Sequence, residues 1–141
     1  MTDADHIEAI RQLKAQYFRL MDTKDWAAFR ELFTTDVRID VSADGAGVFE
    51  GLDAFLAMLL PALDNVVTVH HGHMPEITFL DSDTATGIWA MEDQLWWPEG
   101  QPIRYLHGFG HYHETYVRTS EGWRISSLRL TRLHRIFEFS E

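Results

Sequence analysis

The second half of the chain is dominated by four long segments of strand-like sequence. They cover residues 66–80, 84–97, 103–118 and 122–137. The connections between them, "DSD", "PEGQP" and "SEG", are short and consist of residues that favour turns. Long strands joined by short connections pair antiparallel with their neighbours. We therefore expect an antiparallel meander that is strongly curved, because right-handed twist accumulates along strands of this length.

The first half of the chain shows helical patterns instead. In residues 3–22, apolar side chains recur every three or four positions, which is typical of an amphipathic helix. Residues 24–36 repeat this pattern and predict a second, short helix, whereas residues 37–42 alternate as a strand. Residues 51–65 predict a third helix that bends or ends near Pro61. Helices followed by a meander indicate an α+β fold whose sheet curls over the helices.

Length and composition limit the class of protein. With 141 residues and no internal repeat, low-complexity run or linker, the chain is expected to form a single domain over residues 1–141. The absence of cysteine excludes disulfides and thiolate chemistry. A net charge of -10 would repel nucleic acid and anionic lipid, and the longest apolar run is too short to span a bilayer. We expect a cytoplasmic protein that binds neither nucleic acid nor membrane.

One acid in the second long strand occupies an energetically costly position. In "TGIWAMEDQLWW", alternation places Trp89, Met91 and Asp93 on the same strand face. A carboxylate among large apolar side chains must be paired, hydrogen-bonded or protonated, because an isolated buried charge is strongly destabilising. Asp93 is therefore either a structural acid bonded to an arginine or a functional group in a pocket, and the strand pattern leaves both alternatives open.

Three further side chains are candidates for acid–base chemistry. Asp22 lies at the C-terminal end of the first helix, where the helix dipole disfavours an anion, and Tyr17 lies five residues earlier on the apolar stripe. His70, in "VTVHHGHM", shares a strand face with Thr68 and Gly72. A neutral histidine beside a carboxylate forms a general acid–base pair. The alternative is that Tyr17 is a core residue, Asp22 a helix-end residue and His70 a structural or surface histidine.

A histidine cluster in the third long strand raises the question of a metal site. His107, His111 and His113 in "HGFGHYHE" share strand parity, and imidazoles two residues apart can chelate one ion. The cupin-like pattern also requires a glutamate a few residues later, whereas Glu114 has the opposite parity. We therefore expect no metal at this cluster. The sequence also lacks a serine-hydrolase elbow, a P-loop and a dinucleotide fingerprint.

Five stretches of the sequence follow a known family pattern in order and spacing. They are "YFRLMDTKDWAAFRELFTTDV", "VHHGHMPEI", "TATGIWAMED", "GHYHETYVR" and "GWRISSLRLTRLHR". Together they resemble the SnoaL-like branch of the nuclear-transport-factor-2-like superfamily, nearly from end to end. The resemblance implies a cone-shaped α+β barrel, in which N-terminal helices pack into a strongly curved, mostly antiparallel sheet that encloses a deep apolar pocket.

Within this superfamily the sequence is most similar to scytalone dehydratase and bile acid 7α-dehydratase. These families eliminate water with a His/Asp pair and a tyrosine, without metal or organic cofactor. Asp22 and His70 match the pair, Tyr17 matches the tyrosine of the bile-acid enzyme, and Asp93 matches a further acid that transfers protons in the pocket. Met21 stands where scytalone dehydratase has its tyrosine, so the substrate of that enzyme is not implied. The residues expected to bind the substrate are Trp89, Met91 and Arg132.

The resemblance also implies a function. It predicts a cofactor-independent dehydratase or isomerase-type lyase that acts on a hydrophobic polycyclic, steroid-like or polyketide-like small molecule. The same scaffold hosts non-catalytic binding proteins, so a small-molecule-binding protein is the alternative. Many relatives self-associate, and we therefore expect a homo-oligomer, either a dimer or a trimer.

Overall fold

The structure, a computed structural model, describes residues 1–141. The chain forms three α-helices, one 3-10 helix and six strands. In chain order these elements are α1 (Asp3–Asp22), α2 (Trp26–Arg30), β1 (Phe33–Asp40), η1 (Ser42–Asp44), β2 (Val48–Glu50), α3 (Leu52–Leu63), β3 (Val67–Phe79), β4 (Thr84–Trp96), β5 (Ile103–Thr119) and β6 (Gly122–Phe139). The last four strands coincide with the four long segments predicted from the sequence.

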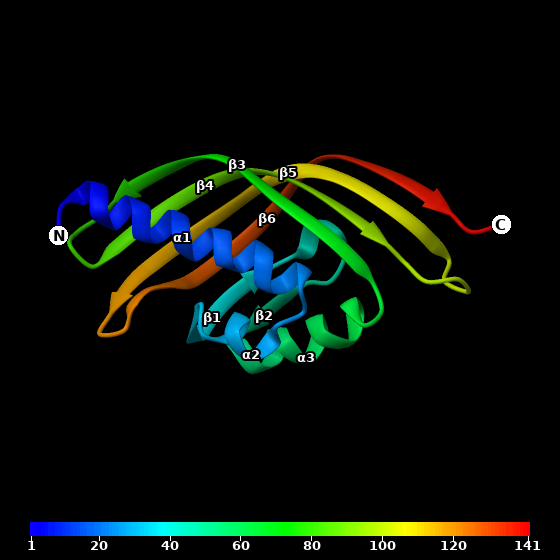
Figure 1. The fold of residues 1–141 in the computed structure, drawn as a ribbon, viewed down its shortest axis with the longest axis horizontal. Coiled ribbons are helices and arrows are strands. Elements are labelled where there is room, and N and C mark those ends of the chain that lie inside the picture. Colours follow the sequence, from blue (N-terminus) through cyan, green and yellow to red (C-terminus); the bar gives the residue numbers. More distant parts are fainter.

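The six strands form one sheet in the order β2-β1-β6-β5-β4-β3. Strands β3, β4, β5 and β6 pair antiparallel with their chain neighbours, as the short turns predict. Strand β1 instead pairs parallel with β6, and β2 pairs antiparallel with β1. The sheet is strongly curved, and the helices lie on its inner side (Figure 1). The predicted α+β fold, with helices packed in a curved and mostly antiparallel sheet, is therefore confirmed.

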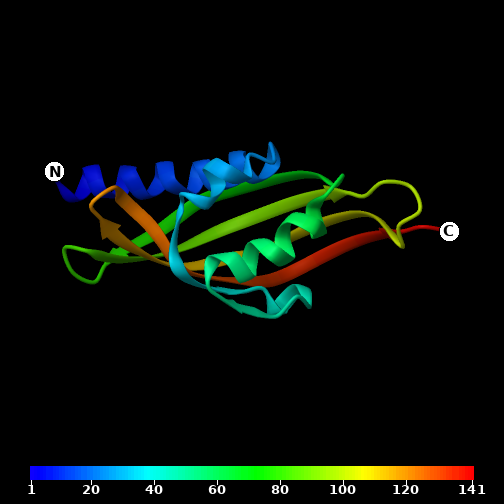
Figure 2. The same ribbon diagram turned by 90° about the horizontal axis from the view of Figure 1, so that it is seen from below.

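Helix α1 lies along β3 and is fixed at both ends (Figure 2). At its start, the side chains of Thr2 and Asp5 each accept a hydrogen bond from the other residue's backbone N–H, which forms a capping box. At its end, the backbone N–H and the side-chain hydroxyl of Thr23 donate hydrogen bonds to backbone carbonyl groups of the last turn. The helix ends at Asp22, as predicted, and this end brings the Asp22 carboxylate against β3. The buried stripe includes Ile10, Leu13, Tyr17 and Met21.

The second helix is shorter than the sequence predicts. Helix α2 has five residues and begins after Asp25, whose side chain accepts a hydrogen bond from the backbone N–H of Ala28. The helical pattern in the sequence continues to residue 36, but β1 already begins at Phe33. Phe33 is buried and pairs with Ile125 of β6, so its apolar side chain serves a strand rather than a helix. The pairing of Phe33 with a strand that is distant in the sequence therefore decides its structure, although the local spacing of apolar residues predicts a helix.

A core of 25 buried apolar side chains fills the space between the helices and the sheet. Helix α3 contributes to this core and ends at Leu63, soon after Pro61, as predicted. Strand β5 is irregular between Phe109 and Gly110, where a Cβ on the glycine would collide with the backbone of Thr131. None of the helices combines the length and the apolar character needed to cross a bilayer.

Candidate active site

Asp22 and His70 meet where the end of α1 lies against β3. The Nδ1 atom of His70 lies 2.7 Å from Oδ1 of Asp22, and the backbone N–H of His70 donates to Oδ2 at 2.8 Å. The hydroxyl of Thr68 donates to Oδ1 at 2.9 Å. Three groups of one strand therefore hold the Asp22 carboxylate in a single orientation. The structure brings together the acid and the histidine that the sequence analysis selected as a pair.

The position of Asp22 at the C-terminal end of a helix is compensated locally. Lys24, two residues after Asp22, has a φ of 61° and ends the helix. This left-handed conformation costs a non-glycine residue about 1–2 kcal/mol. From this turn, Nζ of Lys24 donates to the Thr68 hydroxyl at 3.0 Å. The charge of Lys24 and the hydrogen bonds from β3 together offset the unfavourable helix dipole at Asp22.

The contact with Asp22 decides which tautomer the neutral His70 ring adopts. An ionised Asp22 carboxylate can only accept a hydrogen bond, so Nδ1 of His70 carries a proton, and in the neutral ring Nε2 then presents a lone pair. Nε2 makes no hydrogen bond, and the Oδ2 atom of Asp93 lies 3.9 Å from it. The ring of Phe18 lies nearly parallel to the imidazole, with the centroids 6.5 Å apart. His70 is 8% exposed, so its ring is largely shielded from water.

Asp93 lies on the buried face of β4, as its parity predicts, and is paired with an arginine. Nη1 and Nη2 of Arg132 donate to Oδ1 and Oδ2 of Asp93 at 2.8 and 2.9 Å. Gly108 of β5 is the register partner of Asp93, and a Cβ there would collide with both side chains of the ion pair. The arginine expected of a structural acid is therefore present. The same carboxylate faces His70, so the geometry retains both alternatives left open by the sequence.

Tyr17 lies among aromatic side chains close to these acids. Its ring packs edge-on against Tyr112 of β5, with centroids 5.7 Å apart. Burial, reinforced by the charge of Glu114, raises the pKa of Tyr17 well above its usual value, and the charges of Asp93 and Asp22 act in the same direction. Burial likewise raises the pKa of Tyr112. Both phenols are therefore neutral and able to donate a hydrogen bond.

A fully buried ion pair lies beside the two tyrosines. Nζ of Lys14 lies 2.6 Å from Oε2 of Glu114, and both side chains are 0% exposed. The hydroxyl of Tyr116 donates to Oε1 of Glu114 at 2.6 Å and accepts from the indole N–H of Trp89 at 2.8 Å. The ammonium also lies 3.5 Å from the centre of the Tyr17 ring, within the range of a cation–π interaction. This hydrogen-bond network joins α1 to β4 and β5.

The sequence analysis missed this ion pair, although two signals for it were present. Lys14 is placed four residues after Ile10 and three before Tyr17, which puts it on the buried stripe of α1. Glu114 does not fit a metal site with His113, because the two residues have opposite strand parity. That opposite parity directs Glu114 into the core.

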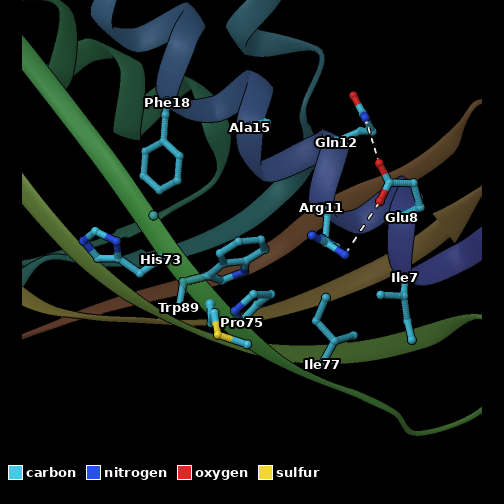
Figure 3. A pocket seen from close by; sticks show the side chains of 12 residues that line it. Ile7, Glu8, Arg11, Gln12, Ala15, Phe18, His73, Pro75, Ile77 and Trp89 are labelled. Atoms are coloured by element: carbon cyan, nitrogen blue, oxygen red, sulfur yellow. Dashed lines mark hydrogen bonds and ion pairs between the residues drawn. The ribbon is translucent and has the colours of Figure 1, made fainter. Parts of the chain in front are cut away.

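The largest of the five main hollows is a groove of about 830 Å³ between α1 and β3 (Figure 3). None of the five is lined by any of the four candidate acid–base residues. The largest groove therefore does not coincide with the candidate acid–base groups. Trp89, expected to bind substrate there, lines the groove together with Phe18, whose ring separates the groove from His70. Met91 is buried against Arg132, with its sulfur 3.8 Å from Nη1.

The histidines of β5 lie on the opposite, outer face of the sheet. His107, His111 and His113 share this face, as their parity predicts. Nε2 of His107 lies 3.5 Å from a carboxylate oxygen of Glu92, and Nε2 of His113 is hydrogen-bonded to Thr131 at 3.0 Å. No group of three or more histidine and acidic side chains in the structure is arranged to hold a metal ion.

Comparison with known proteins identifies the family. The SnoaL-like domain matches residues 2–129. The chain belongs to the SnoaL-like domain family. Among curated relatives of this SnoaL-like chain, the Gibberella zeae protein named Probable cyclase FGR4 is 26% identical over 134 residues, which cover 89% of each sequence. The resemblance found in the sequence is therefore confirmed.

Solved structures share the SnoaL-like fold. A candidate scytalone dehydratase from Novosphingobium aromaticivorans superposes with a TM-score of 0.85 at 21% identity, covering 100% of this chain and 94% of the other. A type 2 hexachlorocyclohexane dehydrochlorinase, LinA, superposes with a TM-score of 0.83 at 19% identity, covering 97% and 93% of the two chains. At these identities the superpositions establish the fold. Proteins named for elimination and cyclisation reactions therefore share this scaffold.

Proposed function

We propose that this SnoaL-like protein is a cofactor-independent dehydratase or isomerase-type lyase that acts on a hydrophobic small molecule. The observation that carries the proposal is the arrangement of His70, whose Nδ1 is hydrogen-bonded to Asp22 while its Nε2 makes no hydrogen bond. Such a histidine is a general base with a fixed tautomer. The reactions for which the relatives are named support the choice of a lyase, because a dehydratase and a dehydrochlorinase both remove a proton and a leaving group from neighbouring atoms.

In the proposed reaction, Nε2 of His70 takes a proton from a carbon next to a carbonyl group. The electron pair of the broken C–H bond forms a C=C bond, and the charge that develops on the carbonyl oxygen requires a donor. Tyr17, a neutral phenol whose pKa is raised in part by the charges of both acids, is the proposed donor. In a dehydration the hydroxyl on the next carbon then leaves with a proton as water, whereas in an isomerisation the proton returns at another carbon.

Asp22 and Asp93 have different proposed tasks. Asp22 fixes the tautomer of His70 and stabilises the imidazolium that forms when Nε2 is protonated. Asp93 faces the Nε2 side of the ring at 3.9 Å and is the second proposed proton-transfer group. Because Arg132 binds both of its oxygens, Asp93 must exchange one of these bonds for a substrate contact before it can carry a proton.

The proposed substrate is a polycyclic, steroid-like or polyketide-like molecule. The apolar side chains around the acid–base groups support this choice, since the Phe18 ring lies against His70 and the Met91 side chain lies against Arg132. Trp89 is proposed to bind substrate from the groove side.

We also propose that the protein forms a homodimer or homotrimer, and sedimentation of the purified protein is expected to give one of these masses. Large apolar side chains are exposed at one end of the sheet, where β5 and β6 extend beyond the helices (Figure 1). Exposed apolar surface of this kind favours association. The exposed side chains are Leu133, Ile136 and Phe139 of β6, together with Val67 at the start of β3. A monomeric mass at micromolar concentration would contradict the proposal.

The His70→Ala variant tests the proposed function. With a panel of hydroxylated polycyclic ketones, and mass spectrometry to detect loss of water or isomerisation, we expect turnover to fall by roughly 10²–10⁴-fold. The melting temperature should change little, because the backbone N–H of residue 70 and the Thr68 hydroxyl still bind Asp22. The matched control is His71→Ala, one position along β3, whose side chain is 58% exposed on the outer face. Undiminished turnover by His70→Ala would falsify the role of the base, whereas ligand binding without any product in the wild type would favour a binding protein.

A further inference from the structure

The turn between β1 and β2 is attached to the rest of the molecule chiefly through one side chain. Within residues 41–47, the remaining hydrogen bonds stay inside the turn or reach only the adjoining end of β1. Gly45 and Gly47 adopt φ angles of 83° and 95°, which cost glycine little. Val41 packs at the edge of the core, but only Asp44 makes hydrogen bonds to another element.

Asp44 binds the same arginine that holds Asp93. Nε of Arg132 donates to Oδ1 of Asp44 at 2.9 Å, and Nη2 donates to Oδ2 at 3.0 Å. Arg135 adds a longer contact to Oδ1 at 3.3 Å. The side chain of Asp44 is 30% exposed, whereas that of Arg132 is 7% exposed. The guanidinium therefore turns one edge inward to Asp93 and the other edge outward to Asp44.

We propose that the Nε–Nη2 edge of Arg132 binds a carboxylate of the substrate, and that Asp44 occupies this site until the substrate displaces it. The inference rests on the proposed function and adds to it a substrate class, a hydrophobic carboxylic acid. The two N–H groups on one edge of a guanidinium match the two oxygens of a carboxylate, and the Asp44 contacts display this match.

Displacement of Asp44 is energetically accessible. The Asp44 side chain is the more exposed member of the pair, so water can solvate its carboxylate when it leaves Arg132. The turn carries its own hydrogen bonds, so it keeps them when Asp44 leaves. The inner ion pair between Arg132 and Asp93 also stays intact, and a ligand carboxylate restores the charge balance of the arginine. Arg132 contacts Asp93, and Asp93 in turn lies 3.9 Å from Nε2 of His70, so the proposed carboxylate site is connected to the base through these two side chains.

The test compares the binding of two probes that differ only in charge. Isothermal titration calorimetry would measure the affinity of 2-naphthoate and of its uncharged amide, 2-naphthamide, for the wild type and for the Asp44→Asn variant. We expect the variant to bind 2-naphthoate about tenfold more tightly, because the competing carboxylate is gone. The affinity for 2-naphthamide should be the same in both proteins.

The matched control is Asp53→Asn, which removes one negative charge from another arginine pair. Asp53 is bound to Arg30, and its side chain is 88% exposed. This control should leave both affinities unchanged, which separates local competition from a change in net charge. Asp44→Ala should reproduce the Asp44→Asn result, because neither side chain can compete as an anion. Equal naphthoate affinity in wild type and variant, an equal gain for the amide, or no naphthoate binding to the variant at millimolar concentration would each overturn the inference.

A second comparison separates this inference from the proposed function. In the Asp44→Asn background, His70→Ala should keep the preference for naphthoate over naphthamide, because Arg132 rather than the base recognises the charge. Loss of that preference on removal of His70 overturns the carboxylate site on Arg132. If no turnover is found while the preference for naphthoate over naphthamide is intact, the proposed enzymatic function is refuted and the carboxylate site on Arg132 is still supported.

Discussion

Replacement of Lys14 by methionine is expected to lower the free energy of unfolding by about 3–5 kcal/mol, because it leaves Glu114 as an unpaired buried charge. Burial lowers the pKa of Lys14 to about 8 while Glu114 opposes this shift, so the amine is protonated at neutral pH. Methionine fills a similar volume, so the expected loss comes from the charge and not from a cavity. Urea unfolding monitored by circular dichroism measures this free energy.

Two further variants define what the Lys14 result means. The double variant Lys14→Met/Glu114→Gln should recover most of the lost stability, because replacing both members of a buried ion pair is often close to neutral. Arg30→Met, which breaks the exposed pair with Asp53, should cost at most about 1 kcal/mol. If Lys14→Met costs as little as Arg30→Met, the buried pair is not the strong contact that its 2.6 Å separation indicates.

The elements that the sequence predicts well are those whose patterns are long and local. Helix α1 has an apolar stripe over five turns, and its predicted end at Asp22 is the observed one. The parity of β4 correctly places Trp89, Met91 and Asp93 on the buried face. The boundary between α2 and β1 is predicted less well. Phe33 belongs to β1 because it pairs with Ile125, a partner more than ninety residues away that no local pattern reveals.

In the candidate site, too, some contacts could be predicted from the sequence and others could not. The proximity of Asp22 and His70 could be predicted. The sequence indicates the helix end and the strand parity, and the family resemblance places the two residues in one pair. The pair formed by Lys14 and Glu114 joins residues 100 positions apart, so the position of each residue indicates that it is buried but does not identify its partner. The contact between Arg132 and Asp44 likewise depends on how a short turn folds against β6. Contacts of this kind are decided by tertiary packing, so the sequence could not predict them.

Asp22→Asn is expected to reduce turnover by roughly a thousand- to ten-thousand-fold while leaving the fold intact, because it reverses the tautomer of His70. The asparagine oxygen must replace Oδ2, which accepts a hydrogen bond from the backbone N–H of His70. The amide nitrogen then replaces Oδ1 and donates to Nδ1 of His70. With Nδ1 accepting, the ring proton moves to Nε2, and the lone pair that would take the substrate proton is lost.

Two controls test this chain of reasoning. Asp25→Asn removes a nearby carboxylate that caps α2 and does not contact His70, so turnover should stay close to that of the wild type. Thr68→Val removes one hydrogen bond to Asp22 but leaves its charge and its contact with Nδ1, so we expect a loss of about tenfold or less. NMR of ¹⁵N-labelled imidazole reports the tautomer directly. A ring that keeps its proton on Nδ1 in Asp22→Asn, together with the full loss of turnover, would show that Asp22 acts through its charge rather than through the tautomer.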